Sequence, residues 1–152
     1  MGLRNIKNKE NGFTIVELLI VIVIIGILAA LVIVAYTGIQ NRARTTKANT
    51  NATALQKKLE AYAADDGLGN GKYPTLVSGV NGMTGTASLS GTGITAIRVA
   101  LDGSSGQTNS VQFLSCASGD GYQLKYWDYT TGAASTNTLT GGTQTTCALP
   151  AS

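Results

Sequence analysis

A run of apolar residues near the N-terminus constrains this chain more than any other feature of its sequence. From Leu18 to Tyr36 it reads LLIVIVIIGILAALVIVAY, nineteen residues without a charge. At about 1.5 Å per helical residue such a run extends about 28 Å, which is close to the hydrocarbon thickness of a bilayer. The sequence therefore predicts a membrane-spanning helix, and one carboxylate, Glu17, stands at the edge of the run.

The residues around Glu17 form a specific motif. A short basic leader ends in Gly12, the stretch Phe13-Thr14-Ile15-Val16-Glu17 follows, and the apolar run ends in GILAALVIVAY. This arrangement resembles that of type IV prepilins with a class III leader peptide, and the related pseudopilins share it. The resemblance is close from about Lys9 to Pro74 and covers the rest of the chain only in outline.

The resemblance implies a processing site and an assembly contact. A prepilin peptidase would cut between Gly12 and Phe13 and would methylate the new N-terminal nitrogen of Phe13. Glu17 occupies the position of the family's glutamate, and its carboxylate would pair with the terminal amine of a neighbouring subunit. Burying either charge alone in the apolar interior of a filament would cost free energy, and pairing the two charges reduces that cost. The alternative is a glutamate that only snorkels to the membrane interface.

The leader, Met1–Gly12, is basic and polar. Its Lys and Arg residues place the start of the helix in the cytoplasm by the positive-inside rule, so the chain after Tyr36 is expected outside the inner membrane. An ordinary secretory signal cut near Ala29-Ala30 is the alternative. Such a signal is cleaved after its apolar region, however, whereas the Gly12-Phe13 pair precedes it.

The helix is expected to continue beyond the membrane, because residues 39–64 contain no Pro. Four apolar residues in this part repeat at spacings of 3 and 4, namely Ala52, Leu55, Leu59 and Tyr62. They predict one stripe that packs against a partner element, as ordinary core rather than as a ligand site. We expect the helix to end near residues 65–67, with Gly67 in the left-handed capping conformation. Many pilins carry a Pro where this chain has Val34, so we expect a straighter helix here.

The remainder predicts a small sheet. Residues 76–93 are rich in Gly, Ser and Thr and indicate a surface loop. Three strand-like segments follow, Ile94–Leu101, Ser110–Cys116 and Tyr122–Tyr129, and their short connections favour an antiparallel meander. Alternation places Ile97, Val99 and Leu101 on one face of the first segment, and Tyr122, Leu124 and Tyr126 on one face of the third.

Cys116 and Cys147 are the two cysteines of the chain. If this half is extracytoplasmic, a disulfide between them is expected, and two free buried thiols are the alternative. The bond would attach the Thr/Gly-rich tail, residues 130–152, to the second strand. Many pilins have a terminal region bounded by a disulfide in the same way.

The composition argues against several functions. The chain has no His, which removes histidine acid–base catalysis and most zinc sites. A Ca²⁺ site that uses Asp120 has little support because no EF-hand loop is present. The net charge is +3, of which the leader supplies +2, and no basic patch with interleaved aromatics follows. We therefore predict no catalytic residues, no metal, no cofactor and no specific nucleic-acid partner.

We predict an α+β pilin fold: a long N-terminal α-helix, transmembrane in its first half, whose second half packs against a small antiparallel β-sheet. In chain order, the expected parts are the leader 1–12, the membrane and assembly half of the helix 13–36, the amphipathic half 37–66, the αβ-loop region 67–93, and the sheet with its disulfide-bounded end 94–152.

The resemblance implies a structural protein, a major type IV pilin that forms an extracellular filament for adhesion, motility or DNA uptake. Its partners would be other pilin subunits, the prepilin peptidase and an inner-membrane assembly platform, with the precursor held in the membrane before assembly. A pseudopilin of a type II secretion system or competence pilus, or a minor pilin, is the alternative. A membrane-anchored extracytoplasmic enzyme is disfavoured because no acid–base residues cluster in the sequence.

Overall fold

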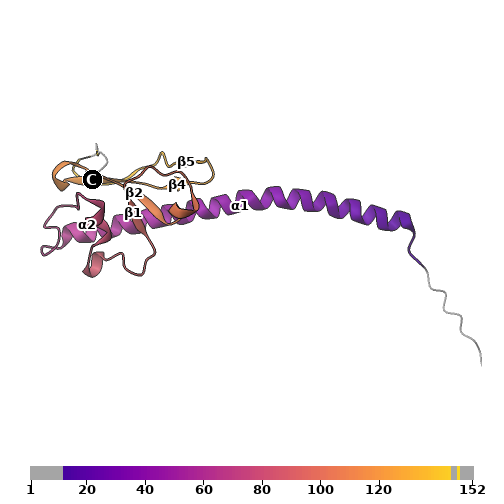
Figure 1. Ribbon diagram of the computed structural model, residues 1–152, viewed down its shortest axis with the longest axis horizontal. Helices are drawn as coiled ribbons and strands as arrows, with labels where there is room; N and C mark the ends of the chain where they lie inside the picture. The colour runs from indigo at the N-terminus through magenta and orange to yellow at the C-terminus, as the bar shows by residue number, and fades with distance from the viewer. Residues whose placement is uncertain (1–11, 145–146, 148–152) are drawn as a thin grey trace, which may run out of the picture. The chain divides into compact units, whose positions relative to one another are not determined.

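The computed structural model describes residues 12–144 and Cys147, so the predicted leader lies outside the described residues except for Gly12. The chain divides into two compact units, Met1–Gly38 and Ile39–Ser152. The elements in chain order are α1 (Ile15–Ala64), α2 (Val77–Asn81), η1 (Gly85–Ala87), β1 (Thr95–Ile97), η2 (Ser105–Gln107), β2 (Ser110–Ser115), η3 (Ala117–Gly119), β3 (Gly121–Lys125), β4 (Trp127–Asp128), β5 (Ala133–Ala134) and β6 (Leu139–Gly142) (Figure 1).

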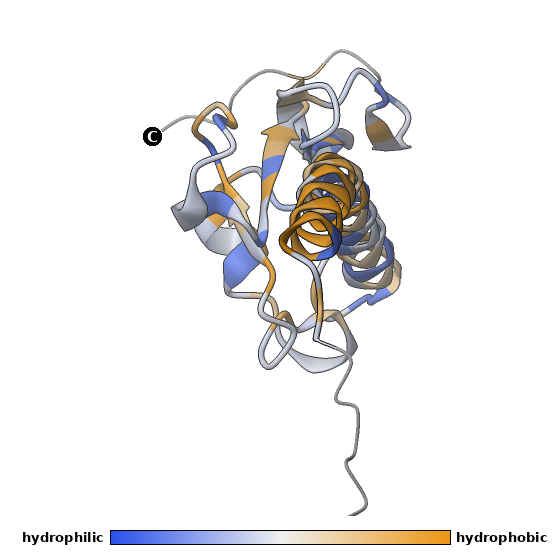
Figure 2. Ribbon diagram, turned by 90° about the vertical axis from the view of Figure 1, so that its right-hand side faces the viewer, coloured by the Kyte–Doolittle hydropathy of each residue, from blue (hydrophilic) through white to orange (hydrophobic). Residues whose placement is uncertain are grey.

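The first unit contains the N-terminal part of α1, which is apolar on every side. Each large apolar side chain from Ile15 to Val34 is at least 50% exposed. Figure 2 shows this part of the helix in orange around its circumference. The buried residues of α1 all come from the second unit. An apolar surface of this kind needs a partner outside the chain, either lipid or other apolar helices.

The end of α1 differs from the prediction at Gly67. The left-handed residues of this turn are Asn70 and Gly71, with φ of 47° and 80°. The Asp65 carboxylate accepts the Gly67 N–H at 2.9 Å. The backbone carbonyl of Asp65 accepts the N–H groups of the three residues that follow Gly67. Gly71 N–H then donates to the Ala63 carbonyl at 2.8 Å. The acidic side chain thus forms the turn, and the left-handed step comes later.

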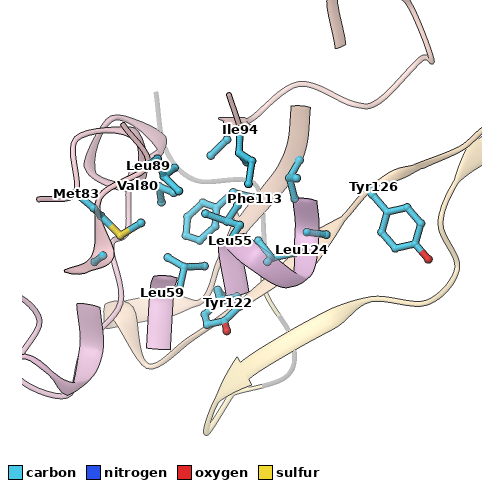
Figure 3. Packing of buried hydrophobic residues seen from close by; sticks show 14 of the residues in the cluster. Leu55, Leu59, Val80, Met83, Leu89, Ile94, Phe113, Tyr122, Leu124 and Tyr126 are labelled. Carbon is cyan, nitrogen blue, oxygen red and sulfur yellow. The ribbon is translucent and has the colours of Figure 1, made fainter. Parts of the chain in front are cut away.

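The predicted stripe on α1 is confirmed. Ala52, Leu55 and Leu59 are fully buried, Tyr62 is partly buried, and Ala48 extends the stripe by one turn. Figure 3 shows Leu55 and Leu59 among the side chains of the sheet and of the segment before it. The largest fully buried side chains that meet the stripe are Phe113, Tyr122, Leu124, Val80 and Val111.

The main sheet has the strand order β1-β2-β3-β6. β2 pairs with β3 and β3 with β6 in antiparallel fashion, but β1 runs parallel to β2, so the predicted all-antiparallel meander is wrong at its first step. A parallel neighbour requires a crossover of a dozen or so residues, and the stretch 98–109 supplies it. The face prediction also fails in this strand, because Ala96 is buried while Val99 is 67% exposed.

The third predicted strand is divided between two sheets. Tyr122 and Leu124 are buried as predicted, and so is Tyr126, which lies between β3 and β4. Tyr126 accepts the Ser135 N–H at its carbonyl at 2.7 Å, which brings β5 beside β4. The tail after residue 130, which carried no structural prediction, supplies both β5 and the edge strand β6.

The segment predicted as a surface loop, residues 76–93, is part of the core. It forms α2 and the short turn η1, and its buried side chains are Val80, Met83, Ala87 and Leu89. Asn81 fixes the segment to β1, because its side chain donates to the Ala96 carbonyl and accepts the Ala96 N–H, both at 2.9 Å. Isolated apolar residues among Gly, Ser and Thr show no periodicity, so the sequence pattern did not indicate that these side chains are buried.

The architecture is α+β, as predicted. A long apolar N-terminal helix continues into a segment that packs against a small, mostly antiparallel sheet, which is the pilin-like arrangement.

Candidate processing and assembly site

A reciprocal pair of hydrogen bonds closes the start of α1. The Glu17 carboxylate oxygen Oε2 accepts the Thr14 backbone N–H at 2.8 Å and the Thr14 hydroxyl at 2.8 Å. In return, the Thr14 hydroxyl oxygen accepts the Glu17 N–H at 3.2 Å. This is a capping box, in which the first side chains of a helix satisfy N–H groups that have no partner within it.

The pattern Thr-x-x-Glu before an apolar run is the sequence signal of a capping box, although only charge pairing was predicted for Glu17. It gives Glu17 a second role beside the predicted charge pairing. Both hydrogen bonds that Glu17 accepts from Thr14 end on Oε2, whereas no described residue donates to Oε1. Glu17 can therefore close its own helix and still offer an oxygen to a cation outside the chain.

Gly12 and Phe13 lie directly before this capped helix. Both residues are exposed, Phe13 to 83%, and they precede the first residue of α1, Ile15. A Cβ at Gly12 would have no heavy atom within 4 Å. The peptide bond between them is thus outside regular structure and open to an enzyme. The helix that follows is long and apolar enough to cross a membrane by its length and composition.

Comparison with protein families agrees with this arrangement. Residues 7–33 match the model of the prokaryotic N-terminal methylation motif. This chain carries that motif. The methylation motif contains Gly12, Phe13 and Glu17, so the three predicted residues fall inside one short matched segment that ends within the apolar part of α1.

Curated relatives come from secretion systems. The chain is 38% identical over 77 residues to type II secretion system core protein G of Aeromonas hydrophila, which is 51% of each chain. It is 37% identical over 82 residues to the protein of that name from Escherichia coli, 54% of each chain. The Vibrio cholerae protein matches at 37% over 75 residues, 49% of each. The chain thus spans about half the length of the relatives it matches, and no solved structure matches it significantly.

Outside the methylation motif, the structure brings together a set of polar residues that the sequence did not indicate. Glu60 accepts the Tyr73 hydroxyl at 2.8 Å on Oε2 and the Tyr122 hydroxyl at 2.7 Å on Oε1. The two tyrosine rings meet edge to face, with centroids 4.8 Å apart. Burial, followed by the Glu60 hydrogen bond and charge, raises the pKa of Tyr73 to about 12. The same causes raise the pKa of Tyr122.

This cluster ties three segments together, because Glu60 belongs to α1, Tyr73 follows the helix and Tyr122 belongs to β3. Gly141 in β6 completes it: a Cβ there would stand 2.4 Å from the Glu60 carboxylate and 2.5 Å from the Tyr122 ring. Both hydroxyls are protonated near pH 7, because the pKa of each is raised, and both donate to the same carboxylate. The cluster is therefore a structural link between α1, the segment after it and β3.

The two cysteines, for which a disulfide was expected, also come together. The structure joins Cys116, directly after β2, to Cys147, with a sequence separation of 31. Asp120, the residue considered for Ca²⁺, forms an ion pair with Lys72 instead. Within residues 12–144 and Cys147, no three His, Cys, Asp or Glu residues gather in a way that could hold a metal ion.

Proposed function

We propose that this chain is a pilin-like structural subunit of the pseudopilin type, which is processed at Gly12–Phe13 and polymerises into a helical filament. The observation that carries the proposal is the methylation motif at residues 7–33, which includes Gly12 and Phe13 and runs into a capped helix whose first half has no apolar partner within the described chain. Such a helix needs lipid before assembly and other copies of itself afterwards.

The pseudopilin form is favoured over the major type IV pilin that the sequence alone predicted. Several curated relatives are type II secretion system core protein G, at 32–38% identity. A major pilin of a surface pilus is kept as the second candidate, because the Cys116–Cys147 disulfide bounds the C-terminal region as it does in many pilins. Both candidate functions include processing and polymerisation, and they differ in the location of the filament.

The proposed partners follow from this function. A prepilin peptidase would cut after Gly12 and methylate Phe13, and an inner-membrane assembly platform would then extract the subunit. The mature amine of Phe13 is a cation at or near neutral pH, and Oε1 of a neighbour's Glu17 is the proposed acceptor. The precursor would reside in the inner membrane, and the filament would extend from it into the periplasm or, for a surface pilus, beyond the cell.

Processing is tested by mass spectrometry of the chain purified from cells that contain a prepilin peptidase. The expected product begins at N-methylated Phe13. Gly12→Val should leave uncut precursor in the membrane, because a side chain at this position would block the close approach to the backbone that Gly allows. A wild-type product that begins elsewhere, for example after Ala30, would overturn the proposal.

Location separates the two candidates. A strain lacking this chain is tested for release of its secreted enzymes and for surface fibres recovered by shearing. If the chain is a pseudopilin, we expect the strain to lose secretion and to keep the same amount of sheared surface fibres. A type IV pilin predicts loss of the fibres with secretion intact, and no change in either measurement would contradict both candidates.

A further inference from the structure

Three basic side chains follow the apolar segment of α1. Arg42, Arg44 and Lys47 come six, eight and eleven residues after Tyr36, and all three are exposed. The sequence has no Asp or Glu between Glu17 and Glu60, so this part of the helix carries positive charge alone. We call Arg42, Arg44 and Lys47 the basic collar.

The basic collar has few partners within the described chain. The Arg44 guanidinium lies over the Tyr129 ring, 5.8 Å from its centroid, which leaves its N–H groups available. The Arg42 and Lys47 side chains take part in no hydrogen bond or ion pair among the residues that the structure describes. Their charges are therefore free to meet an anion that the chain itself does not supply.

Asp128, the acid that bonds to α1 within the collar, is already engaged. Asp128 accepts the Thr45 hydroxyl at 2.9 Å and the Thr130 N–H at 2.8 Å on one carboxylate oxygen. These bonds, led by the Thr130 N–H, lower the pKa of Asp128, so its charge is present at neutral pH. One fixed carboxylate against three basic residues leaves the collar with net positive charge.

We propose that the basic collar binds anionic phospholipid headgroups on the extracytoplasmic face of the membrane while the chain is anchored there. The proposal rests on the proposed function, because it requires the apolar segment to span the bilayer. At about 1.5 Å per residue the collar lies about 9–16 Å along the helix beyond Tyr36, whereas headgroup regions add about 5–7 Å to each side of the hydrocarbon layer, so its long side chains must extend back to meet them. Side chains on a helix point back toward its N-terminus, which directs the collar toward this layer. Guanidinium groups match phosphate oxygens in geometry as well as charge.

Removal of the leader changes which basic side chains flank the apolar segment. The leader carries Arg4, Lys7 and Lys9, and the collar carries the same number of basic residues on the other flank. Only Lys and Arg within about 15–20 residues of a segment count toward its charge bias. Cleavage after Gly12 removes every basic side chain from the cytoplasmic flank and leaves the collar. The collar then supplies all the basic side chains that flank the apolar segment closely.

The test measures lipid binding by the full mature chain in zwitterionic micelles. Phosphatidylglycerol or phosphatidylcholine is titrated in, and native mass spectrometry counts the bound lipids. Each basic residue near an anionic surface is worth about fivefold in affinity. We therefore expect Arg42→Gln with Lys47→Gln to weaken phosphatidylglycerol binding by about 25-fold and to leave phosphatidylcholine binding unchanged.

The matched control is Lys57→Gln with Arg98→Gln. It removes one Lys and one Arg, both exposed and without a hydrogen bond or ion pair to any residue that the structure describes, and it should bind phosphatidylglycerol like the wild type. Equal losses in both double variants would overturn the proposal, since attraction would then depend on net charge alone. So would a wild type without preference for phosphatidylglycerol.

A further outcome would assign the collar to another copy of the chain. If Arg42→Gln with Lys47→Gln binds phosphatidylglycerol normally but forms no filaments, the collar contacts a neighbouring subunit and the lipid proposal is wrong. Failure of the proposed function is recorded separately, because the same spectra give the N-terminus. A chain that does not begin at methylated Phe13 contradicts the processing proposal whatever its lipid binding.

Discussion

At the scale of single residues, Glu17 combines two tasks that substitutions can separate. Its carboxylate closes the capping box with Thr14, and its charge is the proposed partner of a neighbour's Phe13 amine. Glu17→Gln keeps a carbonyl oxygen that can accept the Thr14 N–H but removes the charge. We expect normal insertion and cleavage of this variant and loss of filaments, measured by electron microscopy and by mass spectrometry of the membrane fraction.

Thr14→Val is the complementary variant. It removes the hydroxyl from the capping box, which typically costs about 1 kcal/mol of helix stability, and it keeps the Glu17 charge. Filaments should therefore form, with faster amide hydrogen exchange in the first turn of α1. Filaments from Glu17→Gln together with none from Thr14→Val would show that capping, and not charge, controls assembly.

The residue scale also shows what sequence reasoning can recover. Gly12, Phe13 and Glu17 could be predicted as site residues because they lie close together in a specific motif. The capping box was equally local, and the pattern Thr14-x-x-Glu17 was sufficient to predict it. The Glu60 cluster was out of reach, because Tyr73 and Tyr122 are 13 and 62 residues away and converge only in the folded chain.

At the scale of elements, the buried stripe of α1 holds the sheet. The Leu59 side chain is fully buried, with 0% of it exposed to solvent, and it belongs to the same core cluster as Tyr122 and Val80. Leu59→Ala should lower the free energy of unfolding of the second unit by about 2–5 kcal/mol, because a cavity replaces the side chain. Thermal unfolding followed by circular dichroism in detergent measures this loss.

The control for Leu59→Ala is Lys57→Ala, an exposed position on the same helix. Alanine is the best helix former, so neither substitution weakens the helix itself. The control should change stability by no more than about 0.5 kcal/mol. Similar losses in both variants would mean that the stripe does not carry the packing.

Element types were easier to predict than their pairing. The stripe on α1 follows from helical spacing alone, and β2 and β3 were expected for their apolar residues and short turn. The direction of β1 was missed because it depends on the path of residues 98–109, which no local pattern encodes. α2 was missed because its core contribution rests on Val80 and a few other apolar residues dispersed among small polar ones.

At the scale of the whole molecule, the disulfide closes a long loop. Cys116 and Cys147 are 31 residues apart and enclose β3 to β6. In the chain-entropy model such a bond contributes about 3–4 kcal/mol by restricting the unfolded chain. Cys116→Ser with Cys147→Ser should lower the unfolding temperature accordingly, and reductant should lower that of the wild type alone. An unchanged wild type under full reduction would contradict this.

The Glu60 cluster makes the stability of the second unit depend on pH in the alkaline range. The pKa of Tyr73 is raised to about 12, first by burial and then by its bond to Glu60, whereas a tyrosine in the unfolded chain titrates near about 10. Below pH 10 both states hold the proton, and the contribution is complete. Above it the unfolded state loses the proton first, so stability falls as the pH rises from about 10 to 12.

Tyr73→Phe tests this directly. The variant should be less stable than the wild type at pH 7 by about 0.5–1.5 kcal/mol, because the hydrogen bond to Glu60 is lost. Its stability should then fall less steeply between pH 10 and 12, so that the two curves converge. Tyr129→Phe, whose hydroxyl bonds to no described residue, should keep the wild-type slope. Parallel curves for Tyr73→Phe and the wild type would show that the hydrogen bond from Tyr73 to Glu60 does not stabilise the link between α1 and the segment after it.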